Sequence, residues 1–120
     1  MILNCVKKIW LYPEVVDFRK QQNGLIVLIV EALDKDPGSG ELFIFRNRAR
    51  NKLKMVYFDG RLFWLLYCRL EKGCFKLPDT KSATLSLSPD QFQWLLSGID
   101  FINQKVNKPL NKSIIVILSV

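Results

Sequence analysis

The spacing of apolar residues predicts a strand and then a helix at the start of the chain. The segment 7–13 (KKIWLYP) predicts a short opening strand. Beyond it, apolar residues recur at the spacing of an amphipathic helix: Leu25, Leu28, Ile29, Ala32 and Leu33. Asp17 is expected to cap this helix, because its carboxylate can accept from free backbone N–H groups. The helix is expected to end near Leu33, since residues 36–40 (DPGSG) strongly favour a loop.

Three β-strands are predicted in the middle of the chain. They cover residues 41–46 (ELFIFR), 52–58 (KLKMVYF) and 61–70 (RLFWLLYCRL), which are rich in aromatic and aliphatic residues. The dipeptide Asp59-Gly60 separates the last two strands and suits a two-residue type I′ turn. Such a turn predicts a definite register, in which Phe58 pairs with Arg61, Met55 with Trp64, and Leu53 with Leu66.

This register gives the predicted hairpin two different faces. One face is wholly apolar or aromatic, so we expect it to be buried: Leu53, Met55, Tyr57, Leu62, Trp64 and Leu66. The other face interleaves cations with apolar and aromatic side chains: Lys52, Lys54, Val56, Phe58, Arg61, Phe63, Leu65 and Tyr67. The rings of Phe58, Phe63 and Tyr67 either stack on nucleobases or form core beneath the first helix. We favour the core interpretation, because the first helix has few other places to pack.

A second helix is predicted near the end of the sequence. Ser88 is expected to be its N-cap, with Pro89 at the first helical position and Gln91 completing a capping box. Gly98 is expected to mark its C-terminus. The apolar face of this helix comprises Phe92, Leu95, Leu96 and Ile99. Residues 84–87 are expected to be extended, and residues 74–77 to form a short strand.

Together these elements predict one α+β domain over residues 1–102. It has an antiparallel, hairpin-rich sheet, one helix before the sheet and one helix after it. Residues 103–120 are expected to form a mobile tail, because residues 103–113 are rich in Asn and Lys. The apolar end of this tail is too short to span a bilayer, which takes about 20 residues.

Positive charge is concentrated in one segment of the chain. The net charge is +7, and residues 46–76 alone hold nine Lys or Arg against two acids. A focused charge of this kind favours a polyanionic partner such as DNA. Every second residue from Arg46 to Lys54 is basic, which on a twisted ribbon would place these cations on one side. The alternative interpretation is that the charges keep the hairpin free of edge aggregation. The candidate nucleic-acid-binding residues are Arg46, Asn47, Arg48, Arg50, Lys52, Lys54, Arg61 and Arg69.

The chain carries little catalytic equipment. It has no histidine, and its 11 acids show no metal-ligand spacing. Asp17, Asp59 and Glu71 are interpreted as a cap, a turn residue and a salt-bridge partner. The three cysteines lack CxxC spacing, which indicates reduced, mostly buried thiols in a cytoplasmic protein. We therefore expect no enzymatic activity, no catalytic or metal-binding residues, no cofactor and no membrane partner.

Several linked motifs, found in a fixed order, resemble a known family. In chain order they are 16–20 (VDFRK), 23–25 (NGL), 36–37 (DP), 39–40 (SG), 42–48 (LFIFRNR), Lys54, 59–60 (DG), 69–75 (RLEKGCF) and 95–100 (LLSGID). Over about residues 10–101 the chain is similar to the accessory protein (TnpB) encoded by the second reading frame of the insertion sequence 66 family. The chain departs from the family pattern at Gln21 and near Leu62, where glycine is usual, and at Cys68, where lysine is common. The loss of a cation at position 68 weakens the electropositive character slightly.

The resemblance implies an accessory protein encoded beside a separate transposase and needed for transposition. Strand-transfer chemistry would then belong to the transposase, which agrees with the sparse catalytic equipment here. The favoured hypothesis is a non-catalytic factor that contacts DNA through the basic hairpin. The alternative is an adaptor that docks the transposase without touching DNA. The oligomeric state is left open.

Overall fold

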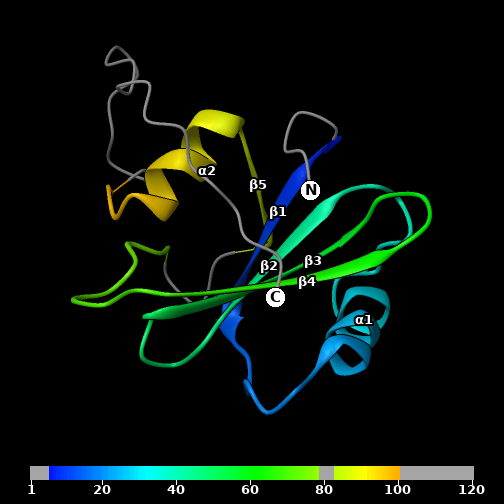
Figure 1. Ribbon diagram of the computed structural model, residues 1–120, viewed down its shortest axis with the longest axis horizontal. Helices are drawn as coiled ribbons and strands as arrows, with labels where there is room; N and C mark the ends of the chain where they lie inside the picture. Colours follow the sequence, from blue (N-terminus) through cyan, green and yellow to red (C-terminus); the bar gives the residue numbers. More distant parts are fainter. Residues whose placement is uncertain (1–5, 79–82, 101–120) are drawn as a thin grey trace.

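A five-stranded sheet with a helix on each face forms the body of the protein (Figure 1). The computed structural model describes residues 6–78 and 83–100. The elements in chain order are β1 (Ile9–Val15), α1 (Gln22–Glu31), β2 (Leu42–Arg46), β3 (Lys52–Phe58), β4 (Phe63–Arg69), β5 (Leu85–Leu87) and α2 (Pro89–Leu96). This arrangement confirms the predicted α+β class, with one helix before the hairpin strands and one after. The predicted tail 103–120 lies outside the described residues.

The strands lie in the order β4-β3-β2-β1-β5. Strand β2 pairs antiparallel with β3, β3 with β4, and β1 with β5. The β1–β2 pair is parallel, which the sequence patterns did not indicate. Parallel neighbours need a crossover connection, and here α1 supplies it. The sheet is therefore mostly antiparallel, with one parallel pair at the β1–α1–β2 unit.

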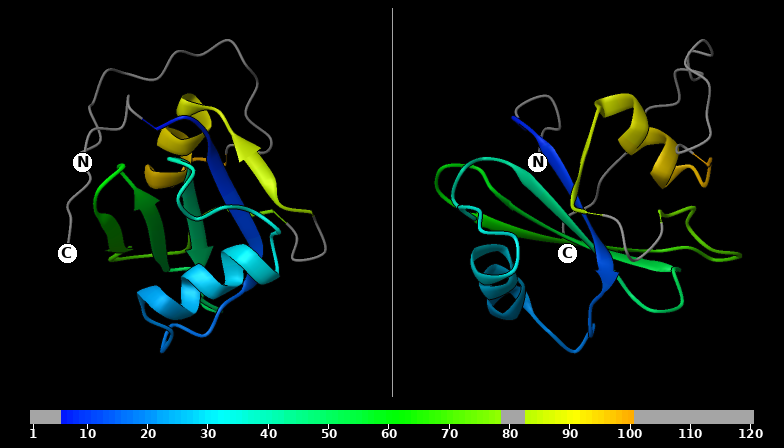
Figure 2. Two further views of the ribbon diagram at one scale, coloured as in Figure 1. Left: turned by 90° about the vertical axis from the view of Figure 1, so that its right-hand side faces the viewer. Right: turned by 180° about the vertical axis from the view of Figure 1, so that it is seen from behind.

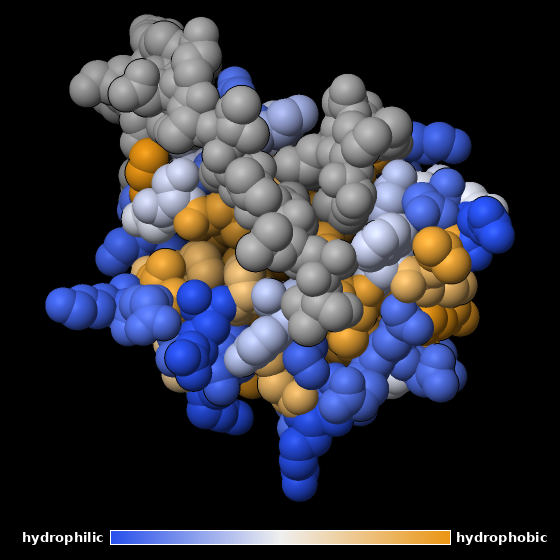
Figure 3. All heavy atoms as spheres, viewed as in Figure 1, coloured by the Kyte–Doolittle hydropathy of each residue, from blue (hydrophilic) through white to orange (hydrophobic). Residues whose placement is uncertain are grey.

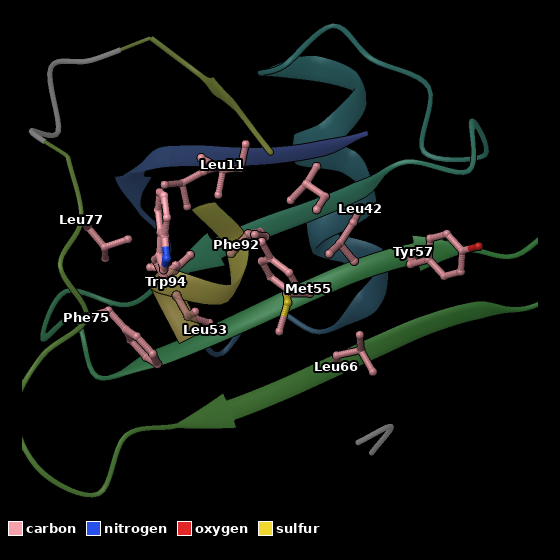
Figure 4. Close-up of a cluster of buried hydrophobic side chains, with 14 residues drawn as sticks. Leu11, Leu42, Leu53, Met55, Tyr57, Leu66, Phe75, Leu77, Phe92 and Trp94 are labelled. Carbon is pink, nitrogen blue, oxygen red and sulfur yellow. The ribbon is translucent and has the colours of Figure 1, made fainter. Parts of the chain in front are cut away.

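Two hydrophobic cores lie on opposite faces of the sheet (Figure 2). Helix α2 covers one face, where Phe92 and Leu95 pack with alternate residues of β2 and β3, as Figure 4 shows for Leu42, Met55 and Phe92. Helix α1 covers the other face with Leu25 and Ile29. Its partners there are the intervening residues Phe43, Phe45 and Val56. Strand β2 is consequently buried on both faces, in agreement with its continuous apolar run.

The hairpin of β3 and β4 forms as predicted, but its register differs by two residues. The observed pairs place Phe58 opposite Phe63, Met55 opposite Leu66, and Leu53 opposite Cys68. Strand β4 begins at Phe63 instead of Arg61, so residues 59–62 form the loop. A register shift by an even number of residues leaves each side chain on the same face of the sheet. The buried face is therefore mostly confirmed even though the predicted pairs are wrong.

Asp59 is the physical cause of the longer loop. Its carboxylate Oδ1 accepts the backbone N–H groups of Arg61 and Leu62 at 2.8 and 2.7 Å. The backbone N–H of Asp59 donates to the Leu62 carbonyl at 3.0 Å. Leu62 thus lies in the loop with 54% of its surface exposed, and its predicted burial is wrong. Trp64 is only half-buried, because its indole N–H reaches out to Asp59 Oδ2 at 2.8 Å.

The first helix begins later than predicted. Its N-cap is Gln21, whose side chain makes no capping hydrogen bond. Asp17 does not cap the helix, since its Oδ1 accepts the Arg19 backbone N–H at 2.9 Å in the preceding turn. The same carboxylate pairs with the Arg19 guanidinium at 2.6 Å, and this hydrogen bonding lowers the pKa of Asp17 to about 2. The helix ends within two residues of the predicted Leu33.

The second helix follows the prediction closely. Ser88 Oγ accepts the Gln91 N–H at 3.1 Å, and the Gln91 side chain accepts the Ser88 N–H at 2.8 Å. Gly98 has a positive φ of 79° just beyond the helix, as a C-terminal glycine requires. Trp94, which was not assigned to the apolar face, is also buried. Residues 74–77 form no strand, although Phe75 and Leu77 are buried.

Candidate functional site

Two segments far apart in the sequence meet at one end of the sheet. The β2–β3 loop (residues 47–51) lies beside the segment that follows β4 (residues 70–76). The Leu70 N–H donates to the Asn51 carbonyl at 2.7 Å, and the Phe75 N–H donates to the Arg50 carbonyl at 2.6 Å. Lys52 and Arg69 are paired residues on the adjoining strands. These contacts hold the two segments together as one surface.

This surface, the basic end, carries six cations and one acid. The cations are Arg48, Arg50, Lys52, Arg69, Lys72 and Lys76, and the acid is Glu71. All six are exposed except Lys52, which is half-buried. Glu71 lies 3.8 Å from the Arg69 guanidinium, but both side chains are mostly exposed, so solvent screens this pair strongly. Hydrophilic side chains project at the left of Figure 3, where the segment 70–76 lies.

Lys72 and Lys76 were not among the predicted site residues. Both contributed to the charge count of residues 46–76, but they lie outside the alternating run. Only the hydrogen bonds between the segment after β4 and the β2–β3 loop bring them to the same surface. The one usable sequence signal was the local excess of charge.

Asn47 builds the loop that presents Arg48 and Arg50. Its side-chain Oδ1 accepts the backbone N–H groups of Asn51 and Lys52, both at 3.1 Å. Its Nδ2 donates to Asn51 Oδ1 at 2.7 Å. Arg50 has a positive φ of 60°, which this bonding supports. Asn47 therefore shapes the basic end, and its amide is already occupied within the protein.

Arg46 is buried, contrary to the expectation that the alternating cations share one side. Only 1% of its surface is exposed, and its Nε donates to the Pro13 carbonyl at 2.8 Å. Its Nη2 is buried without a hydrogen-bond partner among the described residues. Burial, together with Arg50 and Arg48, lowers the pKa of the Arg46 guanidinium. Arg46 lies on the α2 side of the sheet with Ile44, whereas Lys54 shares the α1 side with Phe45.

Lys54 also points inward and ties the turn before α1 to the sheet. It is 8% exposed, and its ammonium donates to the carbonyls of Phe18 and Lys20, both at 2.9 Å. The same ammonium lies 5.1 Å from the centre of the Phe18 ring. Burial, with repulsion from Lys52, lowers the pKa of Lys54. Two of the predicted cations thus have structural partners in place of solvent.

Arg61 is exposed but lies at the other end of the hairpin. It is in the β3–β4 loop, whereas the basic end lies at the start of β3. Strand β3 has seven residues, so the two ends are separated by about 20 Å. Lys7 is near Arg61, because both Lys7 and Gly60 line one small surface pocket. The eight predicted residues therefore do not form a single site.

A groove of about 470 Å³ adjoins the basic end on the α1 side of the sheet. It is lined by Phe18, Gln21, Lys52, Lys54, Leu65 and Tyr67. Tyr67 is 38% exposed, and Phe63, further along β4, is 39% exposed. The expectation that these two rings are core is wrong, because α1 packs over β2 and β3 and leaves edge strand β4 largely uncovered. Phe58 is half-buried and packs on Phe63, with ring centres 4.5 Å apart.

An apolar patch lies near the β3–β4 loop, away from the basic end. Its residues are Ile26, Val30, Leu62 and Phe63, and Val27, one turn before Val30, extends it along α1 away from β4. All of them except Ile26 are exposed. Gln22 Nε2 donates to the Phe63 carbonyl at 3.1 Å, which places one side of α1 beside β4. Ile26 and Val30 lie four and eight residues after Gln22, on that same side. Figure 3 shows hydrophobic surface at the right of the view, near this loop.

Within residues 6–78 and 83–100, no three His, Cys, Asp or Glu side chains gather as metal ligands would. Burial raises the pKa of the Cys68 thiol. Cys74 is exposed, which differs from the expectation of mostly buried thiols. No helix in the described part of the chain is both long enough and apolar enough to cross a membrane.

Comparison with known proteins identifies the family. The family model described as IS66 Orf2 like protein matches residues 7–106, which is most of the chain. The chain belongs to this family. Two family relatives come from Sinorhizobium fredii (strain NBRC 101917 / NGR234). The uncharacterized protein y4jC is 36% identical over 105 residues, which cover 88% of this chain and 89% of the relative. The uncharacterized protein y4hO is 34% identical over 94 residues, which cover 78% and 82%.

Membership in the IS66 Orf2 like family confirms the resemblance found in the sequence motifs. It associates the chain with DNA transposition as an accessory protein. No solved structure matches the chain significantly.

Proposed function

We propose that this protein is a non-catalytic transposition factor that contacts the DNA backbone through its basic end. The supporting observation is the gathering of six cations and one acid on two segments that are hydrogen-bonded to each other. Lysine and arginine side chains that neutralise phosphates release condensed counterions, which drives binding. Such contacts position a protein on DNA without reading its sequence.

The residues assigned to phosphate contact are Arg48, Arg50, Lys52, Arg69, Lys72 and Lys76. Arg48 and Arg50 protrude on the loop that Asn47 holds in shape. Arg46 and Lys54 are left out, because their donors face protein carbonyls. Arg61 is too far from the basic end to share a short stretch of backbone with Arg48.

The test is duplex binding by the purified protein across a salt series. The variant R48A/R50A is expected to lower the slope of log affinity against log salt by up to about two units, since each phosphate contact contributes about 0.9. The matched control is K7A/R61A, which removes the same charge at the opposite end of the hairpin and should leave the slope nearly unchanged. If both double variants reduce the slope equally, binding depends on net charge and not on the basic end.

A second candidate function is docking of the separate transposase through the apolar patch. Val30 is 49% exposed on the side of α1 that faces β4, near the exposed Leu62 and Phe63, and Val27, 51% exposed, lies one turn before Val30. Clustered exposed apolar residues often mark protein–protein contacts. In this alternative the basic end serves solubility, and R48A/R50A would leave DNA affinity unchanged.

A further inference from the structure

We infer that the groove beside the basic end receives an unpaired nucleobase of a DNA strand whose phosphates lie on the basic end. This inference rests on the proposed DNA contact and adds the kind of DNA that the site prefers. The groove and the basic end are continuous, because Lys52 belongs to both and pairs directly with Arg69. A strand held by the exposed cations therefore passes the mouth of the groove.

The groove has the size and lining that a flat aromatic ligand needs. Pockets for small molecules commonly measure about 300–1,000 Å³, and this one measures about 470 Å³. Tyr67 and Phe18 offer two rings, and Leu65 adds apolar surface. Base stacking on aromatic side chains tolerates every base, since each base has a π-face.

The polar lining favours a nucleotide over a purely apolar ligand. Lys52 stands on the groove wall nearest the basic end, where it can meet a phosphate. Gln21 is exposed, and its side chain is free of any capping role at α1, so its amide is available to a base edge. Lys54 lies beneath the groove as a fixed positive charge held by two carbonyls. A paired base within a duplex cannot enter, so the groove selects single strands or frayed ends.

The experiment compares Tyr67→Ala with two controls in binding to a single-stranded oligonucleotide and to a fully paired duplex. Tyr67→Ala is expected to weaken single-strand binding about five- to hundredfold, the range found for loss of one stacked base. Its affinity for the duplex should stay within about twofold of wild type. The slope of log affinity against log salt should be unchanged, because Tyr67 contacts no phosphate in this proposal. Tyr67→Phe keeps the ring and should bind like wild type. Phe63→Ala removes a ring of equal exposure outside the groove and should also bind like wild type.

Distinct results overturn the two proposals. If wild type binds both DNAs with a salt-dependent affinity and Tyr67→Ala weakens binding to neither DNA, the groove does not bind a base, and the proposed phosphate contact is unaffected. If wild type binds neither DNA at low salt, both proposals are wrong. Competition by a free mononucleotide as effective as the oligonucleotide would overturn the assignment to a DNA strand. Circular dichroism melting of each variant checks that the fold is retained, as the exposure of Tyr67 leads us to expect.

Discussion

Single residues of one chemical type have opposite roles in this protein. Arg46 and Arg48 are two positions apart in the sequence, yet Arg46 is buried and Arg48 is exposed. The alternation of cations is real in the sequence, but it runs through a loop. Residues 47–51 are not extended, so alternate side chains do not point to the same side there. A sequence pattern cannot show this, because the turn depends on the specific bonds that Asn47 makes.

Arg46 is expected to act in stability and not in DNA contact. Arg46→Ala should lower the free energy of unfolding by about 2–5 kcal/mol, since it empties a buried site and leaves the Pro13 carbonyl unpaired. Arg46→Met should be less costly, because it keeps most of the volume and removes a buried charge. Urea unfolding measures both variants, with Arg48→Ala as an exposed control within about 0.5 kcal/mol of wild type. Equal stability of Arg46→Ala and Arg48→Ala would contradict the burial of the Arg46 side chain.

Lys54 and Lys52 form a second matched pair, on the same face of β3. Lys54→Met should destabilise the fold by about 1–3 kcal/mol, because the carbonyls of Phe18 and Lys20 lose their donor. Lys52→Met should change stability by less than about 0.5 kcal/mol and reduce the salt slope of DNA binding instead. Thermal melting and the salt series together separate the two roles. The assignment fails if Lys54→Met alone loses DNA affinity while its melting temperature is unchanged.

At the scale of elements, the sequence predicted which strands and helices exist better than how they join. The alternation in residues 52–58 and 63–69 was sufficient to identify the buried face of the hairpin, because a register error of two residues leaves each side chain on the same face. The register was wrong because the Asp59 side chain closes a four-residue loop that the Asp-Gly dipeptide alone does not reveal. The parallel pairing of β1 with β2 was also missed, because it depends on α1 packing across the sheet. The capping box of α2 was predictable, since all of its partners lie within three residues.

The β3–β4 loop is expected to weaken in acid through Asp59. Hydrogen bonds from the Trp64 indole and from the Leu62 and Arg61 N–H groups lower the pKa of Asp59 in the folded protein. Its stabilising effect is therefore present above the unfolded pKa of about 3.9 and is lost as pH falls through the lower folded value. Asp59→Asn keeps an acceptor but cannot titrate there, so its melting temperature should fall less steeply below pH 4 than that of wild type. Parallel acid profiles for the two proteins would show that the carboxylate does not hold the loop.

At the scale of the whole molecule, the basic end and the apolar patch are separated. The basic end lies where β3 begins and β4 ends, and the apolar patch lies near the opposite loop. The net charge of residues 46–76 was readable from composition, but its gathering into one surface required the hydrogen bonds of residues 50 and 51 to the chain after β4. The apolar patch had no sequence signal of its own, because Val27 and Val30 fit a helical pattern whether covered or exposed. If the basic end contacts DNA as proposed, this separation leaves the apolar patch accessible to a protein partner at the same time.

Two double variants should separate these surfaces in a transposition assay with the cognate transposase. R48A/R50A is expected to reduce transposition in proportion to its loss of DNA affinity, while the transposase still co-purifies with it. The variant V27S/V30S should keep the DNA affinity, the salt slope and nearly the full stability, because both side chains are about half exposed. If V27S/V30S instead abolishes transposition and co-purification while R48A/R50A transposes normally, the adaptor function should replace DNA contact. Loss of co-purification by V27S/V30S alongside loss of transposition by both variants would mean that the two surfaces act together, with the accessory protein joining transposase to DNA.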